Sequence, residues 1–316
     1  MSFRGRAAPE ESRFRLSTCF AASRLSMTGL REVLRMSGTV LSHFQIRPIM
    51  RARRTGQISA TTSLDLGRTT CQVQLANDRV ELPDGQRLGW NTLEEIADDD
   101  VGCFVIEGGQ AKKIQTYSEE FDRHYSLMPT EAAPTMLISG LPMHRIKGTD
   151  PYRDTLTKIR AIAPIRGRVL DTATGLGYTA IEAAKTAEQV VTIEIDPAAQ
   201  QVARFNPWSQ ALFDNPKIRQ IIGDSFEEVQ TFEAGSFSRI IHDPPMFSLA
   251  GELYSEEFYR QLHRVLKRGG KLFHYIGDLD SPSGHRVAKG ATQRLRAAGF
   301  KSVTRQSDAF GLTADK

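Results

Sequence analysis

The stretch from Arg168 to Glu182 reads RVLDTATGLGYTAIE and joins an apolar strand, a turn of small residues and the start of a helix. Val169 and Leu170 end the strand, and residues 172–177 form the turn. Thr, Ala and Gly in a turn let backbone N–H groups approach a ligand, and the dipole of the following helix adds positive potential. The stretch therefore predicts a site for a nucleoside-like cofactor at the end of the strand.

Two cofactors compete for this turn. Gly175 to Ala180 satisfies the G-x-G-x-x-G/A pattern of dinucleotide binders, and an acid, Glu194, follows at the end of the next strand, as expected for NAD. Asp171, however, lies at the tip of the first strand, where its charge would repel a pyrophosphate and attract the ammonium and sulfonium groups of S-adenosylmethionine (SAM). The sequence therefore favours SAM over NAD.

Three further β-rich runs, residues 189–196, 218–224 and 237–247, carry acidic residues at or near their carboxyl ends. Glu194 suits two ribose hydroxyls because a carboxylate accepts two hydrogen bonds side by side. Asp224 is placed to accept a hydrogen bond from an adenine amino group. Ligands of open α/β sheets bind at the carboxyl ends of strands, so these residues predict a single crevice.

From residue 63 to the C-terminus the chain resembles a family of predicted class I SAM-dependent methyltransferases best known from archaea. The resemblance is carried by VLDTATGLGYTAI (169–181), IHDPP (241–245) and LAGELYSEEFY (249–259). It implies an α/β, Rossmann-like sheet that is parallel except for an antiparallel last strand, preceded by a small β-rich domain. It also implies a cofactor-binding set made of Asp171, Thr172, Ala173, Gly175, Gly177, Tyr178, Glu194, Asp224 and Ser225.

Within that set, Asp171, Gly175 and Gly177 are implied to line the methionine end of SAM. Glu194 is implied to bind the ribose and Asp224 the adenine. Ala173 stands where many class I enzymes have a first glycine, which narrows the turn slightly.

Catalysis is expected at Asp243, Pro244 and Pro245. The amine of cytosine or adenine has its lone pair conjugated into the ring, so attack on a methyl group requires acceptors that hold its N–H bonds. The Asp243 carboxylate and the Pro244 carbonyl supply them, because successive prolines fix the backbone. The segment resembles the (Asp/Asn)-Pro-Pro-(Tyr/Phe) signature of amino-methyltransferases.

Two neighbours of this motif complete the predicted catalytic set. Met246 stands where the signature has an aromatic residue, and Phe247 follows one place later, which weakens the case for stacking of a flipped base. His242 is a candidate proton acceptor, with a hydrogen-bonded structural histidine as the alternative.

Composition limits the remaining possibilities. A chain of 316 residues with 40% hydrophobic content can form one α/β domain and an accessory domain, and no apolar run is long enough to span a membrane, so we expect a soluble, cytoplasmic protein. The cysteines Cys19, Cys71 and Cys103 are far apart, without a C-x-x-C pair, so neither a metal site nor a disulfide framework is expected.

Residues 1–56 hold eleven arginines, no lysine and three glutamates, whereas the rest of the chain is mildly acidic. Three interpretations stay open for this basic extension, which we expect to be disordered and not needed for a core. The interpretations are an organellar transit peptide, a nucleic-acid-binding tail, and an upstream extension translated from a wrongly chosen start.

Three more segments follow. Short alternating strands predict a small β-rich domain over residues 57–125, serving either substrate docking or scaffolding and dimerisation. Residues 126–150 are expected to be a linker in which Met143, His144, Arg145 and Lys147 close the pocket, unless they are ordinary linker residues. Residues 151–316 are the SAM-binding methyltransferase domain.

The sequence thus predicts a SAM-dependent methyltransferase acting on an exocyclic base nitrogen of RNA, cytosine N4 or adenine N6 of ribosomal or transfer RNA. Basic residues on the C-terminal helices and strands support an RNA partner weakly. One alternative is a class I small-molecule methyltransferase or aminopropyltransferase, although acidic clusters for a cationic amine are lacking. A second alternative is a non-catalytic RNA-binding assembly factor.

Overall fold

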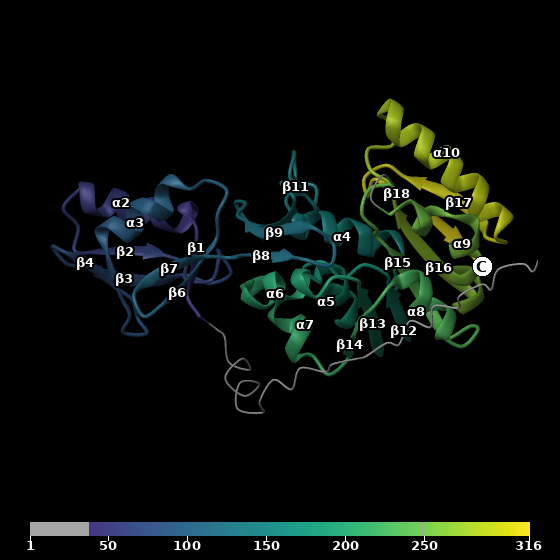
Figure 1. Cartoon of the computed structure of the whole chain (residues 1–316), viewed down its shortest axis with the longest axis horizontal. Coiled ribbons are helices and arrows are strands. Elements are labelled where there is room, and N and C mark those ends of the chain that lie inside the picture. Colours follow the sequence, from purple (N-terminus) through teal and green to yellow (C-terminus); the bar gives the residue numbers. More distant parts are fainter. Residues whose placement is uncertain (1–37, 248–249) are drawn as a thin grey trace, which may run out of the picture. The chain divides into compact units, whose positions relative to one another are not determined.

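A seven-stranded mixed sheet forms the centre of the C-terminal domain (Figure 1). The computed structural model describes residues 38–247 and 250–316. The strand order is β14-β13-β12-β15-β16-β18-β17, and every pair is parallel except those made by β18 with β16 and β17. The strands are β12 (Arg168–Asp171), β13 (Gln189–Glu194), β14 (Ile218–Ile222), β15 (Phe237–His242), β16 (Leu266–Tyr275), β17 (Lys301–Gln306) and β18 (Gly311–Asp315). The expected fold class, including the antiparallel last strand, is confirmed.

Helices cover both faces of this sheet, and the pleat of the strands explains why. Leu170 contributes to a core with helices α8 to α10, whereas its neighbour Val169 contributes to a second core with α4 and α5. Consecutive strand residues point to opposite faces, so strands covered on both sides contain apolar runs without strict alternation. The helices are α4 (Pro151–Ala161), α5 (Tyr178–Ala184), α6 (Pro197–Phe205), α7 (Gln210–Asp214), α8 (Ser225–Thr231), α9 (Glu256–Val265) and α10 (Pro282–Ala297), with short 3-10 turns η2 (Pro207–Ser209) and η3 (Gly251–Tyr254).

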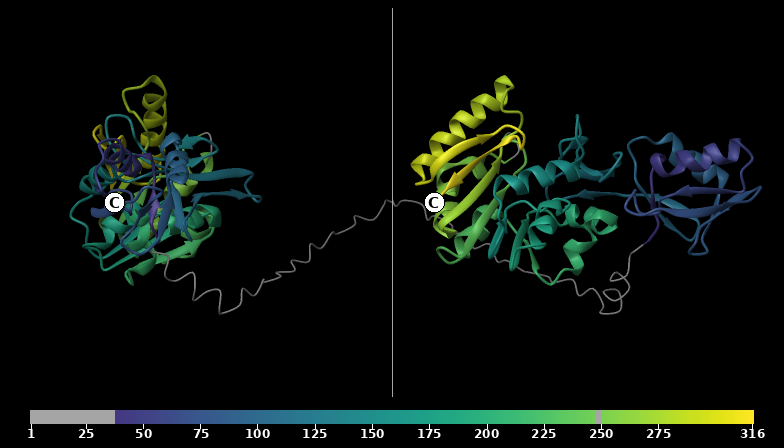
Figure 2. Two further views of the ribbon diagram at one scale, coloured as in Figure 1. Left: turned by 90° about the vertical axis from the view of Figure 1, so that its left-hand side faces the viewer. Right: turned by 180° about the vertical axis from the view of Figure 1, so that it is seen from behind.

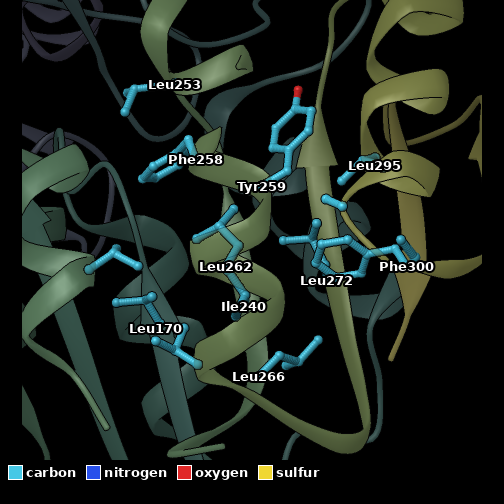
Figure 3. Close-up of a cluster of buried hydrophobic side chains, with 14 of the residues drawn as sticks. Leu170, Ile240, Leu253, Phe258, Tyr259, Leu262, Leu266, Leu272, Leu295 and Phe300 are labelled. Atoms are coloured by element: carbon cyan, nitrogen blue, oxygen red, sulfur yellow. The ribbon is translucent and has the colours of Figure 1, made fainter. Parts of the chain in front are cut away.

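The core beneath α9 shows how helical spacing produces this packing (Figure 3). Phe258, Leu262 and Val265 of α9 are fully buried at intervals of four and three residues and pack in one core with Leu170 and Ile240 of the sheet. Helix α10 belongs to the same core: it contacts α9 and packs on β17 and β18, as both views show (Figures 1 and 2). The carboxyl ends of the parallel strands are therefore held in fixed positions from both faces.

The β-rich N-terminal part is larger than expected, because it begins before residue 57. Helix α2 (His43–Arg54) starts at a capping box in which Ser42 and Gln45 satisfy each other's backbone groups, and it buries Ile46 and Ile49. The expected disordered extension therefore does not reach residue 56. Residues 1–37, on which the rest of that expectation falls, lie outside the described residues.

Two small antiparallel sheets complete this part around one core. Their strand orders are β1-β6-β7 and β2-β3-β4-β5, and helix α3 (Trp90–Asp98) packs beside α2. Arg53 of α2 lies 4.1 Å over the ring of Trp90 and donates to Glu94 at 2.9 Å. The strands are β1 (Val40–Leu41), β2 (Ser59–Thr62), β3 (Cys71–Leu75), β4 (Arg79–Glu81), β5 (Arg87–Gly89), β6 (Phe104–Glu107) and β7 (Gln110–Lys113).

Residues 126–150, expected to be a linker, instead contribute to a third sheet. Its order is β11-β10-β9-β8, with β8 (Gln115–Ser118), β9 (Arg123–Met128), β10 (Thr135–Ile138) and β11 (Leu141–Pro142). Tyr125 and Leu127 of β9 bury one face against Val202 of α6, and the hydroxyl of Tyr178 donates to the carbonyl of Pro134 at 2.8 Å. The segment is therefore packed on the C-terminal domain next to the turn after β12.

Across the part of the chain that the structure describes, we find no helix with the length and apolar character needed to cross a membrane.

Candidate active site

A cavity of about 510 Å³ lies at the carboxyl ends of the central strands. Its walls come from residues that directly follow β12, β13, β14 and β15, from the end of β16, and from the segment around β10 and β11. Seven residues of the predicted cofactor set line it: Thr172, Ala173, Gly175, Tyr178, Glu194, Asp224 and Ser225. The predicted catalytic motif lines it through Asp243, Pro244 and Pro245. The topology thus brings the separate strand ends into one crevice.

The turn after β12 depends on its two glycines. Gly177 is the N-cap of α5 with φ of 75°, and a Cβ at this position would lie only 2.7 Å from a methyl carbon of Leu212. Gly175 has φ of 51°, and a Cβ there would approach only Met136, at 4.0 Å. Gly177 is therefore required by the conformation and by close packing, whereas Gly175 leaves its backbone open to the cavity.

Asp171 is fully buried and is not one of the lining residues. Its Oδ2 accepts from Thr179 at 2.9 Å and from Thr192 at 3.3 Å, while Oδ1 has no hydrogen-bond partner. Burial, reinforced by the nearby charge of Asp243, raises the pKa of Asp171 to about 7. An unpartnered carboxylate oxygen in this position is satisfied if a cationic group binds beside the turn.

Glu194 lies at the end of β13 and lines the cavity. Its two oxygens accept from the backbone N–H groups of Gly175, at 2.8 Å, and of Asp196, at 3.2 Å. Burial raises the pKa of Glu194, while these N–H groups act against the rise. Because an ionised carboxylate has about four acceptor positions, Glu194 retains capacity for two hydroxyl donors.

The wall next to Glu194 suits a planar ring. Ile195 lines the cavity and is 42% exposed, unusual for a large apolar side chain. Asp224 caps α8 by accepting from the N–H of Phe226 at 2.8 Å, and Ser225 donates to the carbonyl of Thr172 at 2.6 Å. The apolar face of Ile195, with the Asp224 carboxylate beside it, fits an adenine, so the residues present fit a SAM molecule.

Asp243 follows β15 and makes a contact that its sequence position does not indicate. Its Oδ2 accepts from Nζ of Lys158 in α4 at 2.6 Å. Lys158 also lies 2.9 Å from Asp154, one helical turn earlier, and Arg145 donates to the other oxygen of Asp154 at 3.0 Å. Sequence reasoning missed Lys158, although a lysine four residues after an aspartate on the buried face of a helix is a usable signal.

His242 does not serve as the predicted proton acceptor in this geometry. It is fully buried, with Nδ1 2.7 Å from the hydroxyl of Thr172 and Nε2 2.9 Å from the carbonyl of Leu253, and it does not line the cavity. Burial lowers its pKa to about 3. Both ring nitrogens are engaged, so His242 is the structural histidine of the alternative interpretation.

Phe247 also lies away from the cavity. It is 50% exposed and meets the ring of Tyr254 edge-on, with 5.3 Å between ring centroids. Tyr254 itself lines the cavity, and its hydroxyl donates to the carbonyl of Pro245 at 3.0 Å. Tyr275, the last residue of β16, lines the same wall. These tyrosines, which sequence reasoning did not single out, are better placed than Phe247 to contact an acceptor.

Three of the four predicted pocket-closing residues line the cavity: Met143, His144 and Arg145. His144 has its Nδ1 3.0 Å from the hydroxyl of Thr135, and burial lowers its pKa to about 3. Arg145 stacks over Phe310 at 3.5 Å. Lys147 is exposed and does not line the cavity.

Comparisons with known proteins agree with this architecture. Residues 148–278 match the family Methyltransferase small domain. The uncharacterized protein MJ1233 of Methanocaldococcus jannaschii is 42% identical over 260 residues, which cover 80% of this chain and 88% of that protein.

More distant relatives act on polyamines. Polyamine aminopropyltransferase 2 of Streptomyces coelicolor is 30% identical over 169 residues, half of this chain, and putrescine N-methyltransferase 3 of Nicotiana tabacum is 27% identical over 140 residues, 43% of this chain. The chain spans only 30% and 37% of the length of these two proteins. A solved spermidine synthase in complex with a transition state analogue is 22% identical with a TM-score of 0.50, covering 58% of this chain and 64% of that one.

Proposed function

Because the chain belongs to the family of the M. jannaschii protein MJ1233 and carries a Methyltransferase small domain, we propose that it is a SAM-dependent methyltransferase. Its proposed acceptor is an exocyclic amino nitrogen of an RNA base, cytosine N4 or adenine N6.

The observation that carries this proposal is the division of one cavity into two chemically different ends. Gly175, Glu194 and Asp224 line the end formed by β12 to β14, whereas Asp243 and Pro244 line the end formed by β15. The first end has the acceptors that a ribose and an adenine require, and the second has the acceptors that an amino group requires. A cofactor and an acceptor bound at these two ends would meet inside one cavity.

At the cofactor end, Glu194 would hold the ribose, Asp224 the adenine amino group, and Asp171 would balance positive charge beside the turn. When bound, SAM supplies an electrophilic methyl group. The chain's own contribution is to fix the position of that group relative to the strand ends and to keep water out.

At the acceptor end, an exocyclic amine would donate one N–H to Asp243 and the other to the carbonyl of Pro244. The two prolines hold that carbonyl in place, and the hydrogen bond from Tyr254 to the carbonyl of Pro245 adds to the constraint. A nitrogen held through both N–H groups turns its lone pair toward the cofactor end. The nitrogen gains a methyl group and loses one proton, for which Asp243 and solvent are the available acceptors.

A second candidate function is transfer of a methyl or aminopropyl group to a polyamine. It is favoured by the two more distant relatives, a polyamine aminopropyltransferase and a putrescine N-methyltransferase. A third, an RNA-binding assembly factor without catalysis, predicts that Asp243 is dispensable.

Mass spectrometry of nucleosides from RNA of a deletion strain separates these functions. We expect one methylated cytidine or adenosine to be lost on deletion and restored by the wild-type gene, but not by an Asp243→Ala gene. An unchanged set of nucleosides, together with an altered polyamine content, would support the second function and contradict the first.

A further inference from the structure

The carboxylate of Asp243 belongs to a chain of four alternating charges, which is buried at Lys158 and Asp154 and partly exposed at Asp243 and Arg145. Lys158 bridges Asp243 and Asp154 at 2.6 and 2.9 Å, and Arg145 follows Asp154 at 3.0 Å. The chain holds two cations and two carboxylates, so its net charge is zero. Asp243 therefore reaches the cavity with its charge already balanced.

The side chain of Lys158 is buried and stays protonated. Its side chain is 3% exposed, and its ammonium lies 4.4 Å from the ring centroid of Tyr275. Burial by itself would lower the pKa of Lys158, but the carboxylates of Asp243 and Asp154 raise it above its ordinary value. Lys158 consequently stays charged at working pH, and dissolved salt screens such a buried pair weakly.

We propose that Lys158 makes the acceptor end of the cavity a subsite for a neutral amine and excludes ammonium groups. This inference rests on the proposed function and names the charge class of its acceptor. Oδ1 of Asp243 makes no hydrogen bond to the described residues, so a neutral N–H donor can use it. An ammonium there would lie close to the ammonium of Lys158, which repels it, and the charge of Asp243 is already offset by Lys158. Asp171, the other carboxylate nearby, is fully buried and does not line the cavity.

The other charged residues that line the cavity do not change this conclusion. Glu194 and Asp224 lie at the cofactor end, and Glu252 is exposed to solvent in η3. Arg123 adds positive charge to the wall. A polyamine brings ammonium groups that need unpaired carboxylates in the acceptor end, and Asp243, which is paired with Lys158, does not provide one.

Isothermal calorimetry with S-adenosylhomocysteine-saturated enzyme tests the proposal. The probes are putrescine, which is a dication, and cytidine and adenosine, which are neutral. Lys158→Gln should increase putrescine affinity at least tenfold, about 1.4 kcal/mol, without improving nucleoside affinity. Lys158→Arg keeps the charge and should show no gain. Lys185→Gln is the matched control, because Lys185 pairs with Glu182 at 2.6 Å but does not line the cavity.

Loss of Lys158 leaves Asp243 without its cation and Asp154 with Arg145 as its remaining partner, so it is expected to destabilise the protein. The double variant Lys158→Gln/Asp154→Asn removes one cation and one anion, still leaves Asp243 without its partner, and should also gain putrescine affinity. Melting temperature and S-adenosylhomocysteine affinity report whether each variant is folded.

Wild-type enzyme that binds putrescine as tightly as the folded Lys158 variants would overturn the proposal. If neither nucleosides nor RNA bind the wild type but the gain in putrescine affinity is present, the RNA proposal fails and the role of Lys158 stands.

Discussion

Replacement of Gly177 by alanine tests whether the turn after β12 has the conformation described here. Two costs add. An alanine at φ of 75° occupies the left-handed region at roughly 1–2 kcal/mol. Its Cβ would also lie 2.7, 2.8 and 3.0 Å from three carbons of Leu212, and overpacking of this kind costs about 1–3 kcal/mol. We therefore expect Gly177→Ala to lower the free energy of unfolding by about 2–5 kcal/mol.

A matched control separates the two costs. Gly235 has φ of 67° and nothing within 4 Å of an added Cβ, so Gly235→Ala should lose only the conformational share, roughly 1–2 kcal/mol. Urea unfolding followed by the fluorescence of Trp90 and Trp208 measures both variants. Combining Gly177→Ala with Leu212→Ala should reduce the cost of the glycine replacement to that of the control. Equal losses for the two single variants would refute the packing argument.

Three further predictions address the cofactor end and the N-terminal part. Glu194→Ala should weaken SAM binding by about 1–3 kcal/mol in calorimetry, through loss of a charge-assisted hydrogen-bond pair, and wild-type affinity would place the ribose elsewhere. Because Asp171 has a raised pKa of about 7, a bound cation should lower that pKa and release protons near pH 7. Calorimetry in buffers of different ionisation enthalpy measures the release, and Asp171→Asn should abolish it. Ile49→Ala should cost about 2–5 kcal/mol of stability in urea unfolding, whereas exposed Arg51→Ala should be near neutral; equal effects would mean that α2 does not pack as described.

The sequence predicts the central sheet well because its strands are buried on both faces. Residues 169–170 and 240–241 are apolar, residues 190–193 are apolar except for the buried Thr192, and each run ends near a polar residue that marks the carboxyl end of a strand. Strand ends in a parallel sheet necessarily meet at one edge, so the positions of Glu194 and Asp243 follow from strand assignment alone.

Other parts of the site depend on contacts between residues far apart in the chain, and the hydrophobic periodicity of the sequence does not reveal such contacts. The pairing of Lys158 with Asp243 joins residues 85 positions apart. The sequence does not tell whether the side chain of His242 faces the cavity or the core. Its hydrogen bonds to Thr172 and Leu253 show that it faces the core. The sequence pattern does not indicate helix α2, because the arginines around Ile46 and Ile49 obscure the apolar periodicity of its buried face.

We propose that one cavity binds SAM at its Glu194 end and an acceptor amine at its Asp243 end. Transfer of a tritiated methyl group from SAM to RNA by purified enzyme, compared between wild type and Asp243→Ala, tests this division of the cavity. We predict that the variant keeps wild-type SAM affinity and loses on the order of a hundredfold or more in kcat, because orientation of the amine supplies several kcal/mol of the barrier. Methylation of RNA by Asp243→Ala at the wild-type rate would contradict the claim.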